Sequence, residues 1–299
     1  MLRYSFQKFL VLFTYCGLTV FMVGLAHAAP AGDERFIRID RSANSEPRAL
    51  QTAIVTFSNQ HAGAARKGEK VASVDLIIAV HIGEKSYFES LNREFKEYDA
   101  VLYELVAPKD EVVEALAQEQ PNPLSSVQRG LTQALGLQFQ LDEIDYRRPN
   151  LLHADLSPDE FVQSMKRRGE SATSMFVKFL AASLEQQKSS NPFDGLAALS
   201  ALLDNDPKRK AIKLKRILAA QTEDMETLVK SINGDEGSTL ISERNARALQ
   251  VLREQLANGK TKLAIYYGAA HMSNFSESLE HDFQMKAVKT RWLDAWNLR

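Results

Sequence analysis

The sequence predicts an α/β domain whose central sheet is mostly parallel, and three neighbouring segments support this prediction. Residues 74–80 are almost unbroken aliphatic, which is typical of a strand covered on both faces. Residues 84–98 place apolar side chains at helical spacing, and residues 100–106 are apolar again. A strand–helix–strand unit of this length makes its two strands parallel neighbours. We therefore expect their carboxyl ends to lie at one edge of the sheet.

The first 28 residues are predicted to be a secretory signal peptide. Arg3 and Lys8 precede an uncharged apolar run over residues 9–25. The small residues around Ala28 fit a cleavage site. The alternative is a membrane anchor formed by residues 9–25, a stretch at the short limit for a span. We expect cleavage, a periplasmic or secreted location, and a single mature domain over residues 29–299.

Composition excludes several classes of function. Apolar residues make up 44% of the chain and charged residues 25%, which is ordinary for a globular protein. Removing residues 1–28, which contain two basic and no acidic residues, changes the formal net charge from -1 to -3. This balance argues against nucleic acid as a partner. Cys16 is the one cysteine, so the mature chain has no disulfide, no thiolate nucleophile and no cysteine metal ligand.

Further strands are expected towards both ends of the mature chain. Residues 35–39 are a possible first strand and residues 50–57 a second. Near the carboxyl end, residues 263–267 form an apolar strand. A short helix around residues 276–281 and a final strand over residues 284–293 follow it.

Between these strands, residues 109–258 are predicted to form a helical insertion or cap over the active edge of the sheet. Prolines 121 and 123 split the first part into two short helical patterns. The segment 139–157 is less regular and unusually polar. Ser157-Pro158-Asp159-Glu160 is a strong helix start, and the last helix of this region is expected over residues 239–257.

Two histidines stand directly after aliphatic strands, His81 in the first half of the chain and His271 near its end. Ligands bind at the carboxyl ends of the strands in sheets of this kind, so the pair indicates a site. Glu104 lies within an apolar segment, where a charge is costly unless it is paired or binds a metal. The alternative is two unrelated turn histidines and a carboxylate paired with an arginine or lysine.

Three further residues are candidates with a plainer alternative. Glu243 and Arg244 share a helix in which most charges face solvent. His153, between Leu152 and Ala154, is a second-tier candidate that would ordinarily be a core or capping histidine.

These motifs resemble those of the TraB/GumN group, which is related to the TIKI metalloproteases and more distantly to erythromycin esterases and haem-binding ChaN proteins. The resemblance rests on Gly268-Ala269-Ala270-His271, on Glu243-Arg244-Asn245, and on Glu104 after the first histidine. The chain departs from the paired Gly-x-x-His pattern at its first copy, where Ile78 replaces the glycine. The implied fold is a parallel sheet with a helical cap, similar to that of the esterases and ChaN.

The resemblance implies a metal-dependent hydrolase that acts on a peptide or a small ester or amide. His81 and His271 would bind a divalent Mn, Co, Fe or Zn ion, or one of them would bind it while the other orients water. Glu104 would be a further metal ligand or the general base. Arg244 would stabilise an oxyanion, and Glu243 would hold Arg244 or join the metal shell. The rival hypothesis is a non-catalytic protein that binds a peptide or haem at the same edge. A membrane is expected as a partner only through an uncleaved amino-terminal segment.

Overall fold

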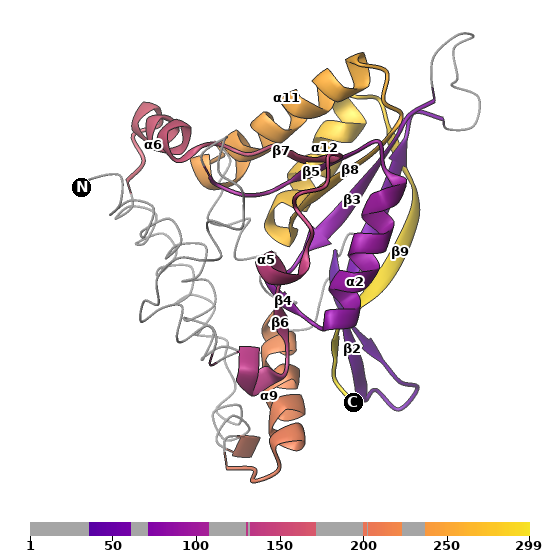
Figure 1. The fold of residues 1–299 in the computed structure, drawn as a ribbon, viewed down its shortest axis with the longest axis vertical. Helices are drawn as coiled ribbons and strands as arrows, with labels where there is room; N and C mark the ends of the chain where they lie inside the picture. Colours follow the sequence, from indigo (N-terminus) through magenta and orange to yellow (C-terminus); the bar gives the residue numbers. More distant parts are fainter. Residues whose placement is uncertain are drawn as a thin grey trace.

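The computed structural model describes residues 36–60, 71–107, 130, 132–171, 200–201, 203–222 and 237–299 (Figure 1). The predicted signal peptide and most of the two helical patterns predicted before residue 136 lie outside these ranges. Among the helices in the described ranges, none combines the length and the apolar character that a membrane crossing requires.

A seven-stranded mixed sheet confirms the α/β fold class. Its central strands β3, β8, β5 and β7 are parallel, in that order, and β2 joins the free side of β3 in the antiparallel sense. Strands β1 and β9 pair with β2, also antiparallel. The bounds are β1 Ile37–Arg41, β2 Pro47–Ser58, β3 Ser73–Ala79, β5 Ala100–Tyr103, β7 Leu151–His153, β8 Lys262–Gly268 and β9 Lys286–Asn297.

The prediction that the first two parallel strands are direct neighbours is wrong, because β8 lies between them. Tyr266 of β8 pairs with Ile77 of β3 on one side and with Tyr103 of β5 on the other. Residues 263–267 are all buried, so β8 is the strand best suited to the centre of a sheet covered on both faces. The carboxyl ends of β3, β8 and β5 still meet at one edge.

Two other predictions about this edge, the place of Glu104 and the structure of residues 139–157, are corrected by the structure. Strand β5 ends at Tyr103, so Glu104 lies just beyond the strand and not within it. The polar segment 139–157 contains β7, which extends the parallel sheet beside β5. The region 109–258 therefore contributes a sheet strand as well as helices. A small separate sheet pairs β4 (Ile82–Gly83) with β6 (Gln138–Phe139).

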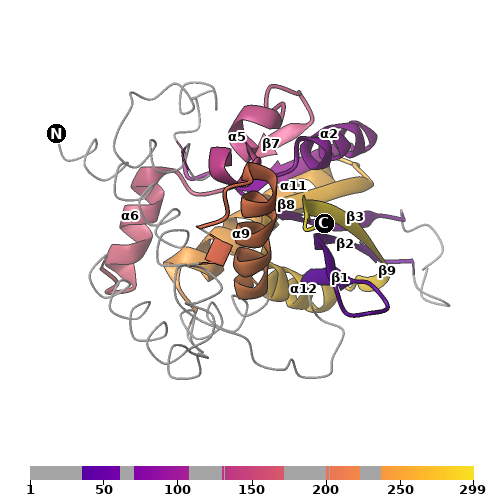
Figure 2. The same ribbon diagram turned by 90° about the horizontal axis from the view of Figure 1, so that it is seen from below.

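Helices cover both faces of the sheet (Figures 1 and 2). One face packs against α2 (Lys85–Glu94), with contributions from α5 (Gln140–Glu143) and α9 (Pro207–Thr222). The other packs against α11 (Arg244–Ala257) and α12 (Met272–His281). Consecutive strand residues alternate between the two cores, as a pleated sheet requires: Tyr266 belongs to the first and Tyr267 to the second.

The predicted helix start at Ser157 is confirmed. Helix α6 (Pro158–Arg167) carries a complete capping box, in which the Ser157 hydroxyl accepts from the Glu160 amide and the Glu160 carboxylate accepts from the Ser157 amide. The helix expected over residues 239–257 begins instead as a π-helical turn, η2 (Thr239–Glu243), which leads directly into α11.

Candidate functional site

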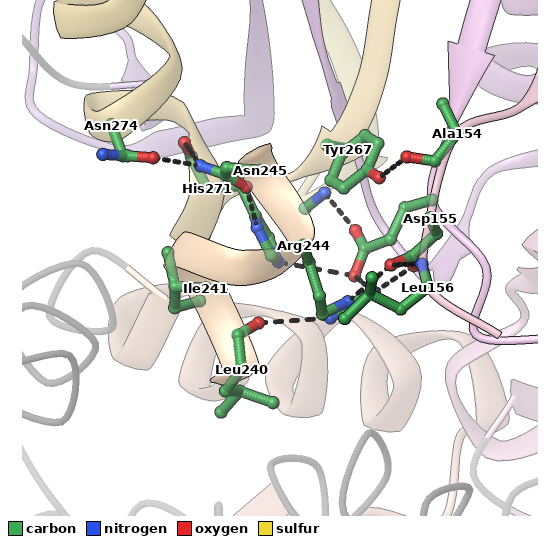
Figure 3. A network of polar contacts seen from close by, with 12 residues as sticks. Ala154, Asp155, Leu156, Leu240, Ile241, Arg244, Asn245, Tyr267, His271 and Asn274 are labelled. Carbon is green, nitrogen blue, oxygen red and sulfur yellow. Dashed lines mark hydrogen bonds and ion pairs between the residues drawn. The ribbon is translucent and has the colours of Figure 1, made fainter. Parts of the chain in front are cut away.

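Polar side chains gather where the parallel strands end. His81 follows β3, Glu104 follows β5, and Asp155 lies two residues beyond β7. Strand β8 ends at Gly268, and the short turn η3 (Ala269–His271) places His271 three residues later. The first residues of α11 add Arg244 and Asn245 from the face of the sheet that α11 covers (Figure 3). The structure thus brings together residues from five separate stretches of sequence.

Arg244 is the centre of a buried ion network. Its Nε and Nη2 donate to the two oxygens of Asp155, at 3.0 and 2.6 Å, and Nη2 also donates to Glu104 Oε1 at 2.6 Å. Asp155 is fully buried, and Arg244 is 6% exposed. One guanidinium therefore faces two carboxylates, and this arrangement leaves an excess of negative charge that favours a further cation nearby.

Glu104 is held from both sides. Its Oε1 accepts from Arg244, and its Oε2 accepts from the Gly268 backbone N–H at 2.7 Å. A Cβ atom at position 268 would lie 3.3 Å from the same Oε2, so the glycine allows this close approach of backbone to carboxylate. Burial by itself would raise the pKa of the Glu104 carboxyl, but Arg244 and His271 hold it well below its usual range.

Asn245 fixes the tautomer of His271. The Asn245 Nδ2 group donates to the His271 carbonyl at 3.1 Å and to Asn274 Oδ1 at 2.8 Å (Figure 3). Because a backbone carbonyl can only accept, the amide nitrogen must face it, and Oδ1 must face His271 Nδ1, 2.5 Å away. His271 therefore carries a hydrogen on Nδ1, and its Nε2 presents a lone pair when the ring is neutral.

That lone pair faces a carboxylate. His271 Nε2 lies 3.5 Å from Glu104 Oε1, and both side chains are fixed by their other partners. Two acceptors in this position repel each other unless a proton or another cation lies between them. The pair is thus arranged to hold a positive charge.

His81 joins the site at the end of β3. Its pKa is lowered by burial, with a further small effect of Arg244, and the opposing effect of Glu104 does not offset these. The ring is therefore neutral at pH 7, as a general base or a metal ligand must be. Its backbone carbonyl accepts from the Gln140 amide at 2.8 Å, which ties the turn after β3 to α5.

The second-tier candidate His153 has a structural environment. Its Nε2 lies 2.5 Å from the Leu105 carbonyl, and its ring packs edge-on against Tyr103. This contact fastens the segment after Glu104 to β7. Within the part of the chain that the structure describes, His153 makes no hydrogen bond or ion pair with Glu104 or His271, so it lies beside the site and not within the ion network.

Glu243 does not hold Arg244. Its carboxylate lies 3.7 Å from Arg167 and 3.6 Å from Arg168, at the end of α6, and its side chain is about one-third exposed. The carboxylate that holds Arg244 is that of Asp155, and not that of Glu243 as predicted. The sequence holds one indication of Asp155 as a site residue: like the two site histidines, it follows a short apolar stretch. With only three residues, however, β7 is too short to be predicted as a strand from the sequence.

The π-helical turn determines how α11 enters the site. The Ser238 hydroxyl caps it by accepting from the Ile241 amide, and the Glu170 carboxylate accepts from the Thr239 amide at 3.1 Å. A π turn is wider than an α turn and is frequent at functional sites. Here it precedes Arg244 and Asn245 directly, so it sets the direction from which both side chains reach the sheet edge.

Ile78, which stands where the first Gly-x-x-His motif would have its glycine, lies within strand β3. Ile78 is fully buried in the core and pairs with Tyr267, whereas the partner of Gly268 in the parallel register is Ala79. The two histidines follow these paired residues at different intervals, two residues for His81 and three for His271. The strand ends are therefore similar in position but not equivalent in local geometry.

The residues around Glu104 fit a divalent cation in part. A tetrahedral ion with bonds of about 2.1 Å places its ligand atoms about 3.4 Å apart, close to the 3.5 Å between His271 Nε2 and Glu104 Oε1. Within the described ranges, however, no three His, Cys, Asp or Glu side chains are grouped as ligands of one ion. His271 and Glu104 are thus the pair that fits, and His81 is not grouped with them as a third ligand.

Comparison of the chain with models of known families, with curated protein sequences and with solved structures found no match. The resemblance to the TraB/GumN group accordingly stays a prediction.

Proposed function

We propose that this protein is a hydrolase of amide or ester bonds whose site is the sheet edge around Glu104. The observation that carries the proposal is the opposition of His271 Nε2 and Glu104 Oε1 at 3.5 Å, each fixed by a second partner. Such preorganised polar groups in a buried setting are typical of catalytic sites. The TraB/GumN resemblance, with the parallel sheet and helical cap of the esterases and ChaN, belongs to the same proposal.

In this proposal His271 and Glu104 hold a divalent ion, with Mn, Co, Fe and Zn as the candidates. Bound there, the ion would polarise a carbonyl and lower the pKa of water. Asn245 keeps the Nδ1 hydrogen of His271 in place, so that Nε2 remains the ligand atom. Arg244, through two hydrogen bonds to Asp155, holds Glu104 in its orientation.

His81 has the properties of the general base. It is neutral at pH 7 because burial lowers its pKa, and it stands at the end of the strand beside β8. In the proposed reaction His81 accepts a proton from the attacking water and later returns it to the leaving amine or alcohol. Arg244 Nη1 makes only a long contact of 3.5 Å to the Leu240 carbonyl among the described residues, so it is the donor available to a developing oxyanion.

Binding of a peptide without hydrolysis is a second candidate function. Binding of haem fits the site less well. The ring of His271 is buried, and Glu104 Oε1 lies only 3.5 Å from its Nε2, a spacing that suits a small ion but not a porphyrin. An axial haem ligand needs one ring nitrogen open towards the iron. A peptide makes no such demand, so peptide binding shares the surface of the proposed hydrolase.

Metal content and hydrolysis, measured together, test the proposal. We expect about one divalent ion per chain by mass spectrometry, lost in His271→Ala and in Glu104→Gln but retained in His81→Ala. Hydrolysis of a peptide and ester panel should fall at least about 100-fold in all three variants. His281→Ala, at the exposed end of α12, is the matched control and should leave both measurements unchanged. Failure of the wild-type protein to retain any added ion would overturn the metal-dependent proposal.

A further inference from the structure

At the same sheet edge, on the other face from the ion network, lies a second polar group that the proposed chemistry does not use. Gln140 Oε1 and the Tyr266 hydroxyl are buried, and neither has a hydrogen-bond partner among the described residues. Gln140 is 6% exposed and Tyr266 is 1% exposed. A buried polar atom without a partner has lost its hydrogen bonds to water without replacement, so such atoms are uncommon in folded proteins.

Gln140 is anchored both through its backbone and through its side-chain carboxamide. Its backbone N–H donates to the His81 carbonyl, and its Nε2 donates to the Tyr146 hydroxyl at 2.7 Å. If the amide were flipped, Oε1 would accept from Tyr146 and Nε2 would lack the partner instead. In either orientation, one atom of this buried carboxamide has an unmet hydrogen bond.

Tyr266 lies in the same environment. Burial is the main reason that its pKa is raised well above its usual value, and the neighbouring groups that add to this are Tyr146, Tyr87 and Glu104. Glu104 also acts on Tyr146, whose pKa is raised for the same main reason. Tyr146 connects the two unpartnered groups: its hydroxyl accepts from Gln140 Nε2, and its ring packs edge-on at 4.9 Å against Tyr103, the residue that pairs with Tyr266 in the sheet.

These residues occupy the opposite face of the sheet from the ion network. Tyr266 belongs to the core beneath α2, whereas Tyr267 and His271 lie on the side of α11 and α12. His81 is linked to both halves, since the charge of Glu104 acts to raise the pKa of its ring and its carbonyl accepts from the Gln140 backbone N–H. The half around Glu104 is charged, while Gln140, Tyr146 and Tyr266 supply a carboxamide and two phenols, which are all neutral.

We propose that Gln140 and Tyr266 form a recognition subsite for an uncharged amide group, such as a peptide bond next to the one hydrolysed. An amide supplies one donor and one acceptor, which together satisfy a carbonyl oxygen and a hydroxyl. Neither a charged group nor a hydrocarbon fits, because the first would be buried without a counter-charge and the second would leave both atoms unpartnered. The inference rests on the proposed function for its place in the site, while its test measures binding and not turnover.

The probes are N-methylacetamide and methyl acetate, which differ in that the ester has an oxygen in place of the N–H group. Binding to the purified protein is followed by NMR titration. We expect the amide to bind at least about threefold more tightly than the ester. Tyr266→Phe should weaken both probes by about three- to tenfold, because both offer the same carbonyl. Gln140→Met should weaken the amide to the level of the ester and leave the ester unchanged.

Stability separates recognition from a merely structural role. Tyr266→Phe removes an unpartnered hydroxyl and should melt at the wild-type temperature or above it. The matched variant Tyr267→Phe removes a hydroxyl that donates to the Ala154 carbonyl at 2.7 Å and should melt lower. Equal binding of the two probes, unchanged binding in both subsite variants, or no binding of either probe would overturn the inference. A protein that binds as expected but hydrolyses nothing would lose the proposed function and keep the subsite.

Discussion

The guanidinium of Arg244 donates two hydrogen bonds to the carboxylate of Asp155, across 89 residues of sequence. The pair fixes α11 to the end of β7 and at the same time presents Arg244 Nη2 to Glu104. Because Asp155 is fully buried, this contact determines how Arg244 is presented to Glu104, whose other oxygen is held by the Gly268 amide.

Asp155→Asn should destabilise the protein by about 3 kcal/mol, because it leaves the buried guanidinium with half of its counter-charge. The measurement is the free energy of unfolding from urea titration. The control is Asp145→Asn, which removes a carboxylate that is 44% exposed and paired with Arg147 and Arg148. That change should cost no more than about 0.5 kcal/mol. Equal effects of the two substitutions would contradict the central role of Asp155.

The ring of His271 should carry its hydrogen on Nδ1. Nitrogen-15 NMR of the imidazole distinguishes the two tautomers directly and needs no substrate. In Asn245→Leu the acceptor for that hydrogen is lost, so the Nδ1–H signature should weaken or shift towards the Nε2–H form. Detection of the Nε2–H tautomer in the wild-type protein would refute the assignment of His271 Nε2 as a ligand atom.

Gly237→Ala should destabilise the entry into α11. Gly237 has a φ of +71°, and a Cβ atom there would lie 2.4 Å from the Ser242 hydroxyl, within the π-helical turn. Gly136→Ala is the control, since its φ is +64° but no atom lies within 4 Å of the added Cβ. We expect a cost of about 1 kcal/mol at Gly136 from backbone strain, and at least about 1 kcal/mol more at Gly237 from the added overlap. Thermal and urea unfolding of both variants measure the difference.

Acid should weaken the contact between α2 and β9. Arg291 donates to both oxygens of Glu94, at 2.8 and 3.0 Å, and this pairing lowers the pKa of Glu94 although burial opposes it. The folded protein therefore binds this proton less readily than the unfolded chain does. The stabilisation is fully present above the ordinary pKa of a glutamate and is lost as the pH falls through the lower, folded value.

Glu94→Gln should flatten the decline of stability between about pH 5 and pH 3, with a loss at neutral pH of about 0.5–1 kcal/mol. The free energy of unfolding, measured at several pH values, gives this slope. Glu97→Gln changes an exposed carboxylate on the neighbouring turn and should leave the slope as in the wild type. An unchanged slope in Glu94→Gln would show that the ion pair does not contribute.

The strands of this protein could be predicted well where their sequence is long and aliphatic. Residues 74–80, 263–267 and the helix after Glu84 were identified because burial on both faces, or on one helical stripe, leaves a clear periodic pattern. The three-residue strand β7 carries no such pattern. It is a strand because β5 offers a free edge to pair with, and that edge exists only in the folded sheet.

For the site, the amino-acid order was enough to show which residue types stand at the strand ends, because His81, Glu104 and His271 each follow an apolar run that forms a buried strand. Their partners were established by the fold. It placed β8 between β3 and β5, gave Arg244 to Asp155 and not to Glu243, and set Asn245 against His271. Strand ends follow from local apolar patterning, whereas hydrogen bonds between side chains depend on strand order and on the direction of α11, which begins 89 residues after Asp155 and 27 residues before His271.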